Sequence, residues 1–217
     1  MIRVKVCCIG SVEEARLAVR EGASALGFVS EMPSGPGVIA EDVINQIAST
    51  VPPSIGTFLL TSRTEPKAII TQQRRCRTNT IQLCDRLTAA AHLALREALP
   101  GISLVQVVHV SDESSIDEAL ELGRRADAIL LDSGNQNAPI KELGGTGRTH
   151  DWSLSKRIIQ SSTVPVFLAG GLCAANVGEA IRSTRPFGVD LCTGVRTNGL
   201  LDPKKLSSFM NAVEAAS

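Results

Sequence analysis

Ala128-Ile129-Leu130-Leu131-Asp132-Ser133 is a short apolar run that ends in an acid, and the glycine-rich Leu143-Gly144-Gly145-Thr146-Gly147-Arg148-Thr149 follows it. The same order, an apolar run and then a glycine turn, recurs in Leu168-Ala169-Gly170-Gly171 and in Gly188–Gly194. Glycine has no Cβ, so its backbone N–H groups can come close to an anion. Glycine turns behind the late strands are the means by which a (β/α)8 barrel holds a phosphate. The pattern therefore predicts a barrel that acts on a small phosphorylated metabolite.

Short β-branched runs alternate with longer amphipathic runs along the rest of the chain. The predicted strands are Val4–Ile9, Ala25–Val29, Ile55–Leu60, Thr80–Cys84, Ser103–Val110, Ala128–Asp132, Val164–Ala169 and Val189–Cys192. The predicted helices are Val12–Glu21, Ala40–Ser49, Glu65–Arg75, Ala89–Ala98, Ser114–Leu122, Trp152–Gln160, Ala174–Arg182 and Pro203–Ala215. Strands that alternate with helices pair in parallel through crossover helices. The short, regular spacing favours a closed α/β barrel, so we predict a single (β/α)8 TIM-barrel domain over residues 1–217.

The length, net charge and apolar runs of the chain limit the classes of protein to which it can belong. The 217 residues fit one barrel domain, and the formal net charge is zero, which gives no reason to expect nucleic acid or an anionic membrane surface as a partner. No run approaches the roughly 18 uninterrupted apolar residues of a membrane helix. The N-terminus begins directly in a strand-like pattern and lacks the apolar core of a signal peptide. We therefore expect a cytoplasmic protein.

The chain has six cysteines, and none forms a CxxC pair. In a chain without a secretion signal, free thiols are the expectation rather than disulfides. Cys7 and Cys8 point to opposite faces of a strand, which argues against a shared metal ion. The three histidines have no partner at metal-ligand spacing. The sequence thus predicts no metal and no cofactor.

Two side chains at strand ends are candidates for catalysis. Cys7 ends the first strand, where a thiol is either a base that faces the site or a small buried hydrophobe. Asp132 ends the sixth strand, where a carboxylate either acts in catalysis or caps the long loop through a hydrogen bond or salt bridge. As a general acid, Asp132 would need a pKa raised by burial.

Lys5 and Asp190 point into the barrel on neighbouring strands by strand parity. We interpret them as an interior ion pair beneath the site, in preference to a Schiff-base role for Lys5. Arg196 either adds charge to a bound phosphate or is solvated. The predicted phosphate-binding residues are Gly144, Gly145, Thr146, Gly147, Gly170, Gly171, Gly194 and Val195.

Longer motifs resemble the phosphoribosylanthranilate isomerase family over nearly the whole chain. The most specific are Leu130–Ser133, Gly144–Ser153 and Leu168–Leu172; Val4–Cys7, Gly22–Val29, Arg185–Asp190 and Gly194–Val195 complete the match. The resemblance implies an Amadori rearrangement of a phosphorylated sugar amine, N-(5′-phosphoribosyl)anthranilate. It implies that Asp132 is the general acid that opens the ribose ring, and that Cys7 is the general base that removes the C2′ proton. The sequence leaves open whether the protein is a monomer or a homodimer.

Three departures from the family pattern concern the anthranilate end of the site. Cys8 occupies a position where the family has glycine, and Cys84-Asp85 occupies the positions of a histidine-glycine pair in the family. Gly35-Pro36-Gly37 matches a serine-proline-arginine run whose arginine pairs with the anthranilate carboxylate. The chain is then a divergent isomerase in which Arg63 or another nearby cation serves the carboxylate, a barrel for another phosphorylated sugar amine, or a non-catalytic sensor.

Overall fold

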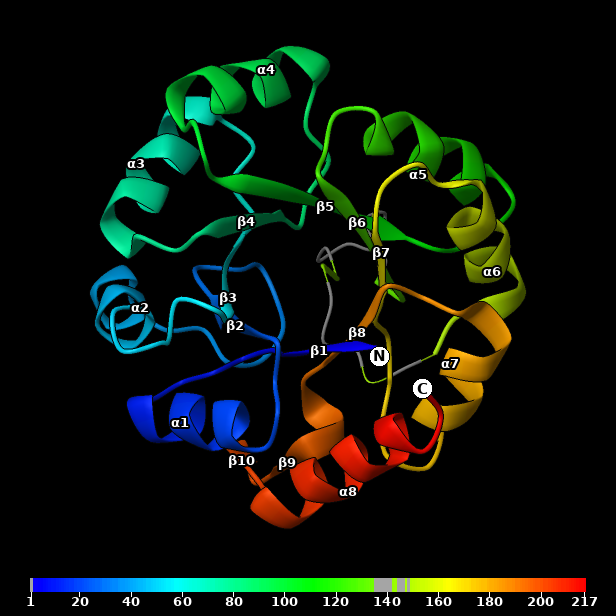
Figure 1. Ribbon diagram of the computed structural model, residues 1–217. Helices are drawn as coiled ribbons and strands as arrows, with labels where there is room; N and C mark the ends of the chain where they lie inside the picture. The colour runs from blue at the N-terminus through cyan, green and yellow to red at the C-terminus, as the bar shows by residue number, and fades with distance from the viewer. Residues whose placement is uncertain (1, 135–141, 144–146, 148) are drawn as a thin grey trace.

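The computed structural model describes residues 2–134, 142–143, 147 and 149–217, and its centre is a closed barrel of parallel strands (Figure 1). The strands pair in chain order, and β8 returns to β1 with Lys5 opposite Asp190. This confirms the predicted (β/α)8 fold. The barrel strands are β1 Arg3–Val6, β2 Ala25–Val29, β3 Gly56–Thr61, β4 Thr80–Leu83, β5 Ser103–His109, β6 Ala128–Asp132, β7 Val166–Leu168 and β8 Gly188–Leu191.

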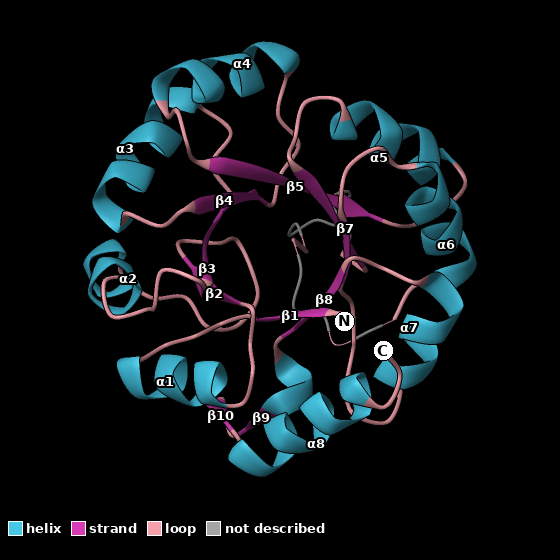
Figure 2. Cartoon of the chain, in the orientation of Figure 1, coloured by secondary structure: helices cyan, strands magenta, loops and turns pink. Residues whose placement is uncertain are grey.

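Helices form a ring around the barrel (Figure 2). Their ends follow local signals: Ser11 caps the first helix by accepting from the Glu14 N–H at 3.2 Å, and Pro203 opens the last one, where its missing N–H costs nothing. No helix among the described residues has the length and apolar character needed to cross a membrane. The helices are α1 Val12–Arg20, α2 Glu41–Ala48, α3 Pro66–Cys76, α4 Ala89–Ala98, α5 Ser114–Gly123, α6 Trp152–Ser161, α7 Val177–Thr184 and α8 Pro203–Glu214.

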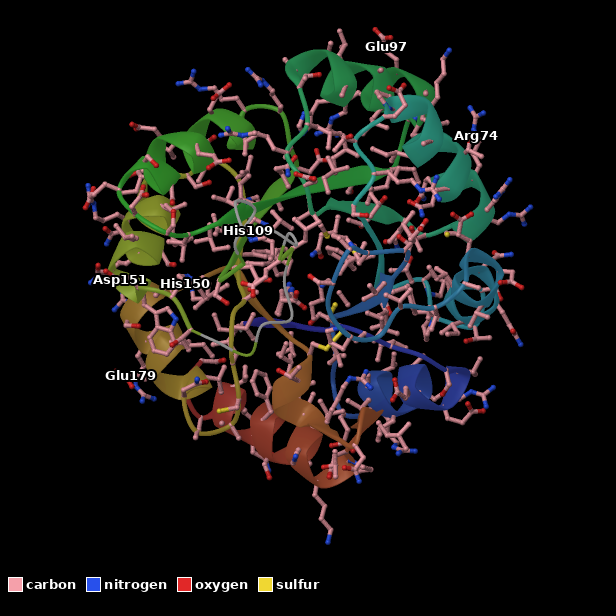
Figure 3. All side chains as sticks on the ribbon, turned by 180° about the vertical axis from the view of Figure 1, so that it is seen from behind. Arg74, Glu97, His109, His150, Asp151 and Glu179 are labelled. Atoms are coloured by element: carbon pink, nitrogen blue, oxygen red, sulfur yellow. A yellow bond between two sulfur atoms is a disulfide. The ribbon has the colours of Figure 1, made fainter. Side chains whose placement is uncertain are left out.

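The strands are buried on both faces, and each face belongs to a different core. Leu26 and Phe28 of β2 pack outward with the helices, whereas Ala25 and Val29 pack into the barrel. Charged side chains such as Arg74 and Glu97 project away from the helix ring (Figure 3). Large inward side chains fill the barrel, so its interior is a packed core, and open space remains at the carboxyl ends of the strands.

The sequence did not predict a small antiparallel pair after β8. Strands β9 (Arg196–Thr197) and β10 (Leu200–Leu201) are joined by Asn198-Gly199, both with positive φ. Asn-Gly is a strong hairpin signal because it tolerates this backbone conformation, but strands of two residues are too short for a periodicity analysis. A short 3-10 helix, η1 (Thr193–Val195), lies between β8 and this hairpin.

Arg196 is neither solvated nor part of the pocket lining. Its guanidinium pairs with Glu14 of α1 at 2.8 Å and donates to the carbonyl oxygens of Cys7 and Cys8. The two charged side chains are only 8% and 13% exposed. Glu14 also accepts from the Leu201 N–H. This buried ion pair ties the chain after β1 to the chain after β8, where the barrel closes.

Replacement of Arg196 by alanine would leave the Glu14 carboxylate buried without its cation. We expect Arg196→Ala to lower the free energy of unfolding by about 3–5 kcal/mol in urea titrations. The matched control is Arg125→Ala, because Arg125 pairs with Glu121 where the two side chains are much more exposed, at 35% and 55%. That variant should lose less than about 1 kcal/mol. Similar losses in the two variants would contradict the assignment of Arg196.

Candidate active site

One pocket opens at the carboxyl ends of the barrel strands, and both predicted catalytic residues, Cys7 and Asp132, line it. It has about 690 Å³ of empty space, part of it open to solvent, which suits a small metabolite. The loop after β2 also contributes, through Met32, Ser34, Gly35 and Pro36. The lining residues include Cys7, Cys8, Val29, Met32, Ser34, Gly35, Pro36, Leu60, Gln82, Cys84, Asp132, Leu143, Gly147, Ala169, Gly170, Gly171, Leu172, Asp190, Leu191, Cys192 and Thr193.

Cys7 follows β1 and is almost fully buried in the pocket wall. Its thiol fits there because Gly27 faces it on β2: a Cβ at Gly27 would lie 2.9 Å from the Cys7 Sγ and 3.1 Å from the Lys5 Nζ. Burial raises the pKa of the Cys7 thiol to about 11, although the positive charge of Lys5 lowers this pKa. The thiol is thus buried next to a cation that favours its ionised form.

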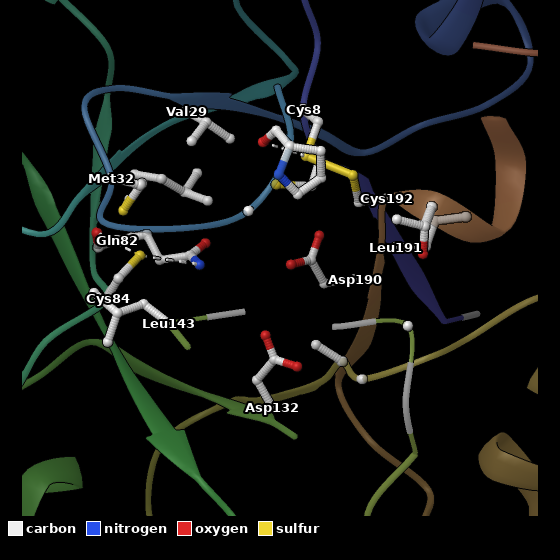
Figure 4. A pocket seen from close by; sticks show the side chains of 18 of the residues that line it. Cys8, Val29, Met32, Gln82, Cys84, Asp132, Leu143, Asp190, Leu191 and Cys192 are labelled. Carbon is white, nitrogen blue, oxygen red and sulfur yellow. Dashed lines mark hydrogen bonds between the residues drawn. A yellow bond between two sulfur atoms is a disulfide. The ribbon is translucent and has the colours of Figure 1, made fainter. Parts of the chain in front are cut away.

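Asp132 is the last residue of β6, and its side chain points into the same pocket (Figure 4). Burial raises the pKa of this carboxyl to about 6. A hydrogen bond from the Ser133 N–H to Oδ1 at 2.7 Å opposes the shift, and the negative charge of Asp190 adds to it. The shift brings the pKa of this carboxyl closer to neutral pH, as a general acid requires.

Lys5 and Asp190 form the interior ion pair that the strand parity predicted, with Nζ and Oδ1 2.9 Å apart. Lys5 is fully buried, and its ammonium also lies 5.3 Å from the centre of the Phe58 ring. Asp190 has a second role that the sequence did not reveal, because its carboxylate lines the pocket. The ion pair therefore forms part of the floor beneath Cys7 and Asp132.

The glycine turns occupy the side of the pocket formed by the late strands. Gly170 and Gly171 both have positive φ and line the pocket together with Gly147 and Thr193. Asn176 occupies the N-cap position of α7, and its side chain holds this turn: it accepts from the Cys173 N–H and donates to the Gly171 carbonyl. Helix α7 consequently begins at Val177, later than predicted.

Gly194 and Val195 lie behind this wall. A Cβ at Gly194 would overlap the carbonyl oxygen of Leu172, so glycine is needed for the contact between the two turns. Val195 has its side chain in the outer core, and its N–H is bonded to the Cys192 carbonyl. The predicted phosphate residues Gly144, Gly145 and Thr146 lie outside the described residues.

The loop after β2 has no cation in the pocket, and the structure gives a reason. Cys8 has a left-handed backbone (φ 62°), a conformation that suits the glycine found here in the family. A Cβ at Gly37 would lie 2.5 Å from the Cys8 Cβ. The Cys8 side chain therefore leaves no room for an arginine at position 37 in this loop conformation. Arg63 is not among the lining residues, and it pairs with Glu31 and Glu41.

The expectation of free thiols is wrong for two of the six cysteines. Cys8 and Cys192 form a disulfide between chain segments 184 residues apart, with Cα atoms separated by 5.9 Å. Barrel closure places the carboxyl ends of β1 and β8 side by side, a proximity that sequence spacing alone does not show. The free cysteines of the described chain are Cys7, Cys76, Cys84 and Cys173.

Metal-ligating side chains are not gathered in the part of the chain that the structure describes: no group of three His, Cys, Asp or Glu could hold an ion. His109 and His150 lie inside the helix ring (Figure 3), but neither lines the pocket. The His150 Nε2 is 2.6 Å from the Ser155 hydroxyl, and burial lowers the pKa of this histidine to about 4.

Comparison with known proteins agrees with this geometry. The family model for N-(5′-phosphoribosyl)anthranilate isomerase matches residues 4–212. The chain belongs to this family. An N-(5′-phosphoribosyl)anthranilate isomerase from Methanocella arvoryzae is 35% identical over 90% of this chain and 89% of its own length.

Solved structures of the isomerase family share the fold. The crystal structure of the isomerase from Thermotoga maritima superposes with a TM-score of 0.85 at 30% identity, over 99% of this chain and 100% of the other. A second isomerase structure, in complex with reduced 1-(o-carboxyphenylamino)-1-deoxyribulose 5-phosphate, has a TM-score of 0.82 at 28% identity and the same coverage. The family resemblance read from the motifs is confirmed.

The disulfide between Cys8 and Cys192 predicts how many thiols per chain react with an alkylating agent. Alkylation of the denatured, unreduced protein should modify four thiols per chain, and alkylation after reduction should modify six. A Cys192→Ser variant should show five thiols without reductant, because Cys8 loses its partner. Mass spectrometry gives each count directly. Six reactive thiols in the unreduced protein would show that Cys8 and Cys192 are not bonded.

The raised pKa of Asp132 predicts a stability cost above neutral pH. A carboxyl whose pKa rises on folding favours the folded state while it is protonated, and this contribution is lost as the pH rises through about 6. We expect Asp132→Asn to raise the free energy of unfolding by about 1–3 kcal/mol at pH 8 and to change it little at pH 4. Urea titrations at both pH values test this. A destabilised variant at pH 8 would contradict the burial argument.

Proposed function

We propose that this chain converts N-(5′-phosphoribosyl)anthranilate to 1-(o-carboxyphenylamino)-1-deoxyribulose 5-phosphate, as an enzyme of tryptophan biosynthesis. The observation that carries the proposal is that Cys7 and Asp132, an acid–base pair at the ends of β1 and β6, line one pocket whose late-strand side is made of glycine turns. Membership of the isomerase family supports the choice of reaction. The structural neighbour that holds the reduced product analogue supports the choice of ligand.

Asp132 acts as the general acid in this reaction. It protonates the ring oxygen of the ribose, the bond between C1′ and this oxygen breaks, and the nitrogen lone pair forms an imine at C1′. Burial raises the pKa of Asp132 to about 6, so its proton is available near neutral pH. Asp190 adds a negative charge on the same side, which also favours the protonated form.

Cys7 acts as the general base. Its thiolate removes the proton from C2′ of the protonated imine, the C–H electron pair forms the C1′–C2′ double bond of an enolamine while the C1′–N π electrons return to nitrogen, and tautomerisation gives the ketone. The thiolate is the reactive form. Lys5 lowers the cost of forming it, because its ammonium lies beneath the thiol and lowers the pKa that burial has raised.

The phosphate binds to backbone N–H groups at the late-strand side. Gly147, Gly170, Gly171 and Thr193 face this side of the pocket, and Gly144, Gly145 and Thr146 complete the proposed site. Gly194 and Val195 support the wall from behind, since the Val195 N–H is bonded to the Cys192 carbonyl. The positive φ of Gly170 and Gly171 lets their backbone turn toward the pocket without a Cβ in the way. Proton transfer needs no metal ion or organic cofactor in this scheme.

Substitution of either catalytic residue tests the assignment. We expect Cys7→Ser and Asp132→Asn each to lower turnover by ~10²-fold or more, since each removes one proton-transfer step, while affinity for ribose 5-phosphate stays the same. Loss of substrate fluorescence measures turnover. Cys76→Ser is the matched control, because Cys76 is a buried free cysteine on α3 outside the pocket.

Full turnover in the Cys7 or Asp132 variant would remove that residue from the mechanism. A wild-type protein that binds ribose 5-phosphate but leaves the anthranilate substrate unchanged would favour another phosphorylated sugar amine or a sensor. The two outcomes are distinct, because the first concerns a residue and the second concerns the substrate.

A further inference from the structure

Gln82 is a polar side chain of the pocket that the mechanism above does not use. It lies on β4 and is only 4% exposed, yet it lines the pocket. Among the described residues, its amide oxygen has no hydrogen-bond partner, and its amide nitrogen has one weak contact, with the sulfur of Cys84 at 3.9 Å. A buried amide without partners is costly, so its hydrogen-bonding capacity points to a ligand.

Gln82 lies far from the proposed phosphate side. Figure 4 shows it beside Met32 and Cys84, with Leu191 and Cys192 on the other side of the cavity and the two carboxylates between. The strand order places β4 opposite β8 in the closed ring. A substrate whose phosphate binds at the turns after β6, β7 and β8, and whose sugar lies between Cys7 and Asp132, extends its aryl group toward Gln82.

The aryl group of the substrate carries a carboxylate, which requires hydrogen-bond donors when it is buried. Arginine and lysine are missing from the pocket lining within the described residues. The Cys8 side chain fills the space at position 37, and Arg63 is paired with two glutamates. Ser34 is already engaged in another interaction. The Gln82 amide is therefore the donor best placed to receive this carboxylate.

We propose that Gln82 is the specificity-determining residue for the aryl carboxylate, with Nε2 donating to a carboxylate oxygen and Oε1 available to a donor of the same ligand. The inference rests on the proposed function, because it names the residue that recognises one part of that substrate. In this chain a neutral amide binds the carboxylate with which an arginine forms an ion pair in the family. Recognition is then by hydrogen bonding to a charged acceptor, with the negative charge of the ligand left uncompensated.

A ligand pair with and without the carboxylate isolates this contact. One ligand is reduced 1-(o-carboxyphenylamino)-1-deoxyribulose 5-phosphate, and the other is its phenylamino counterpart without the carboxylate. Gln82→Met keeps the volume and removes both polar groups, and Gln82→Glu places a negative charge against the ligand. Titration calorimetry gives the dissociation constants, and thermal melting reports whether each variant is folded.

We expect Gln82→Met to weaken the carboxylate ligand by about ten- to a hundredfold and to leave the other ligand within about twofold, as expected for loss of a hydrogen bond to a charged group. Gln82→Glu should weaken the carboxylate ligand further. Met32→Ala is the matched control, because this apolar neighbour should affect both ligands equally. Melting of Gln82→Met at or above the wild-type temperature is expected, since an unpartnered buried oxygen is removed.

Equal losses for the two ligands in Gln82→Met would overturn the proposal and make Gln82 a residue that only shapes the pocket. Unchanged affinity for both ligands would overturn it as well. If the wild-type protein binds neither aryl ligand but still binds ribose 5-phosphate, the proposed function fails together with the inference. Failure of Gln82 alone leaves wild-type binding of the carboxylate ligand intact, so the two failures are distinguishable.

Discussion

The ion pair between Lys5 and Asp190 is the constraint on which the rest of the site depends. Closure of the barrel brings β1 next to β8 and sets these two residues opposite each other in register. Burial of either charge alone would be strongly unfavourable, so each requires the other. Because the pair lies beneath the pocket, its two charges act on the groups above it: Lys5 lowers the pKa of Cys7, and Asp190 raises the pKa of Asp132. Barrel closure thereby also sets the electrostatics of the proposed acid and base.

The architecture was predictable from sequence because each strand is a short apolar run and each helix has one apolar face. Strands β2 and β6 and helix α4 have the predicted bounds, and most other elements differ by one to three residues at an end. Helix α7 differs at both ends, because the Asn176 side chain bonds to the preceding turn and the helix begins only after it. Cys7 and Asp132 were found because a polar or reactive side chain at the carboxyl end of a buried strand is unusual in a barrel.

The features that the sequence did not predict depend on contacts between residues far apart in the chain. The spacing of apolar residues carries no information about such contacts. Arg196 and Glu14 meet only because the chain segments after β1 and β8 are adjacent, and the same adjacency joins Cys8 to Cys192. In the sequence, nothing distinguishes Gln82 from other strand residues; the structure shows that its amide faces the pocket and that its oxygen has no partner in the described part of the chain. The residue types were visible in the sequence, but their partners were not.

Two departures from the family pattern, Cys8 after β1 and Gly37 after β2, are linked by a steric contact. Cys8 adopts the left-handed backbone conformation of the glycine that it replaces, so its side chain projects toward the loop after β2 and toward Cys192. A side chain at position 37 would collide with it, and glycine there removes the collision. With Cys8 in this conformation, an arginine at position 37 is excluded on steric grounds. Since Cys8 adjoins Cys7, the disulfide and the proposed base share one backbone segment, and the Arg196 guanidinium holds the carbonyl groups of that segment. On the anthranilate side of the pocket, position 37 holds glycine in place of the family's arginine. The backbone segment of the proposed base is held by the disulfide on one side and by Arg196 on the other.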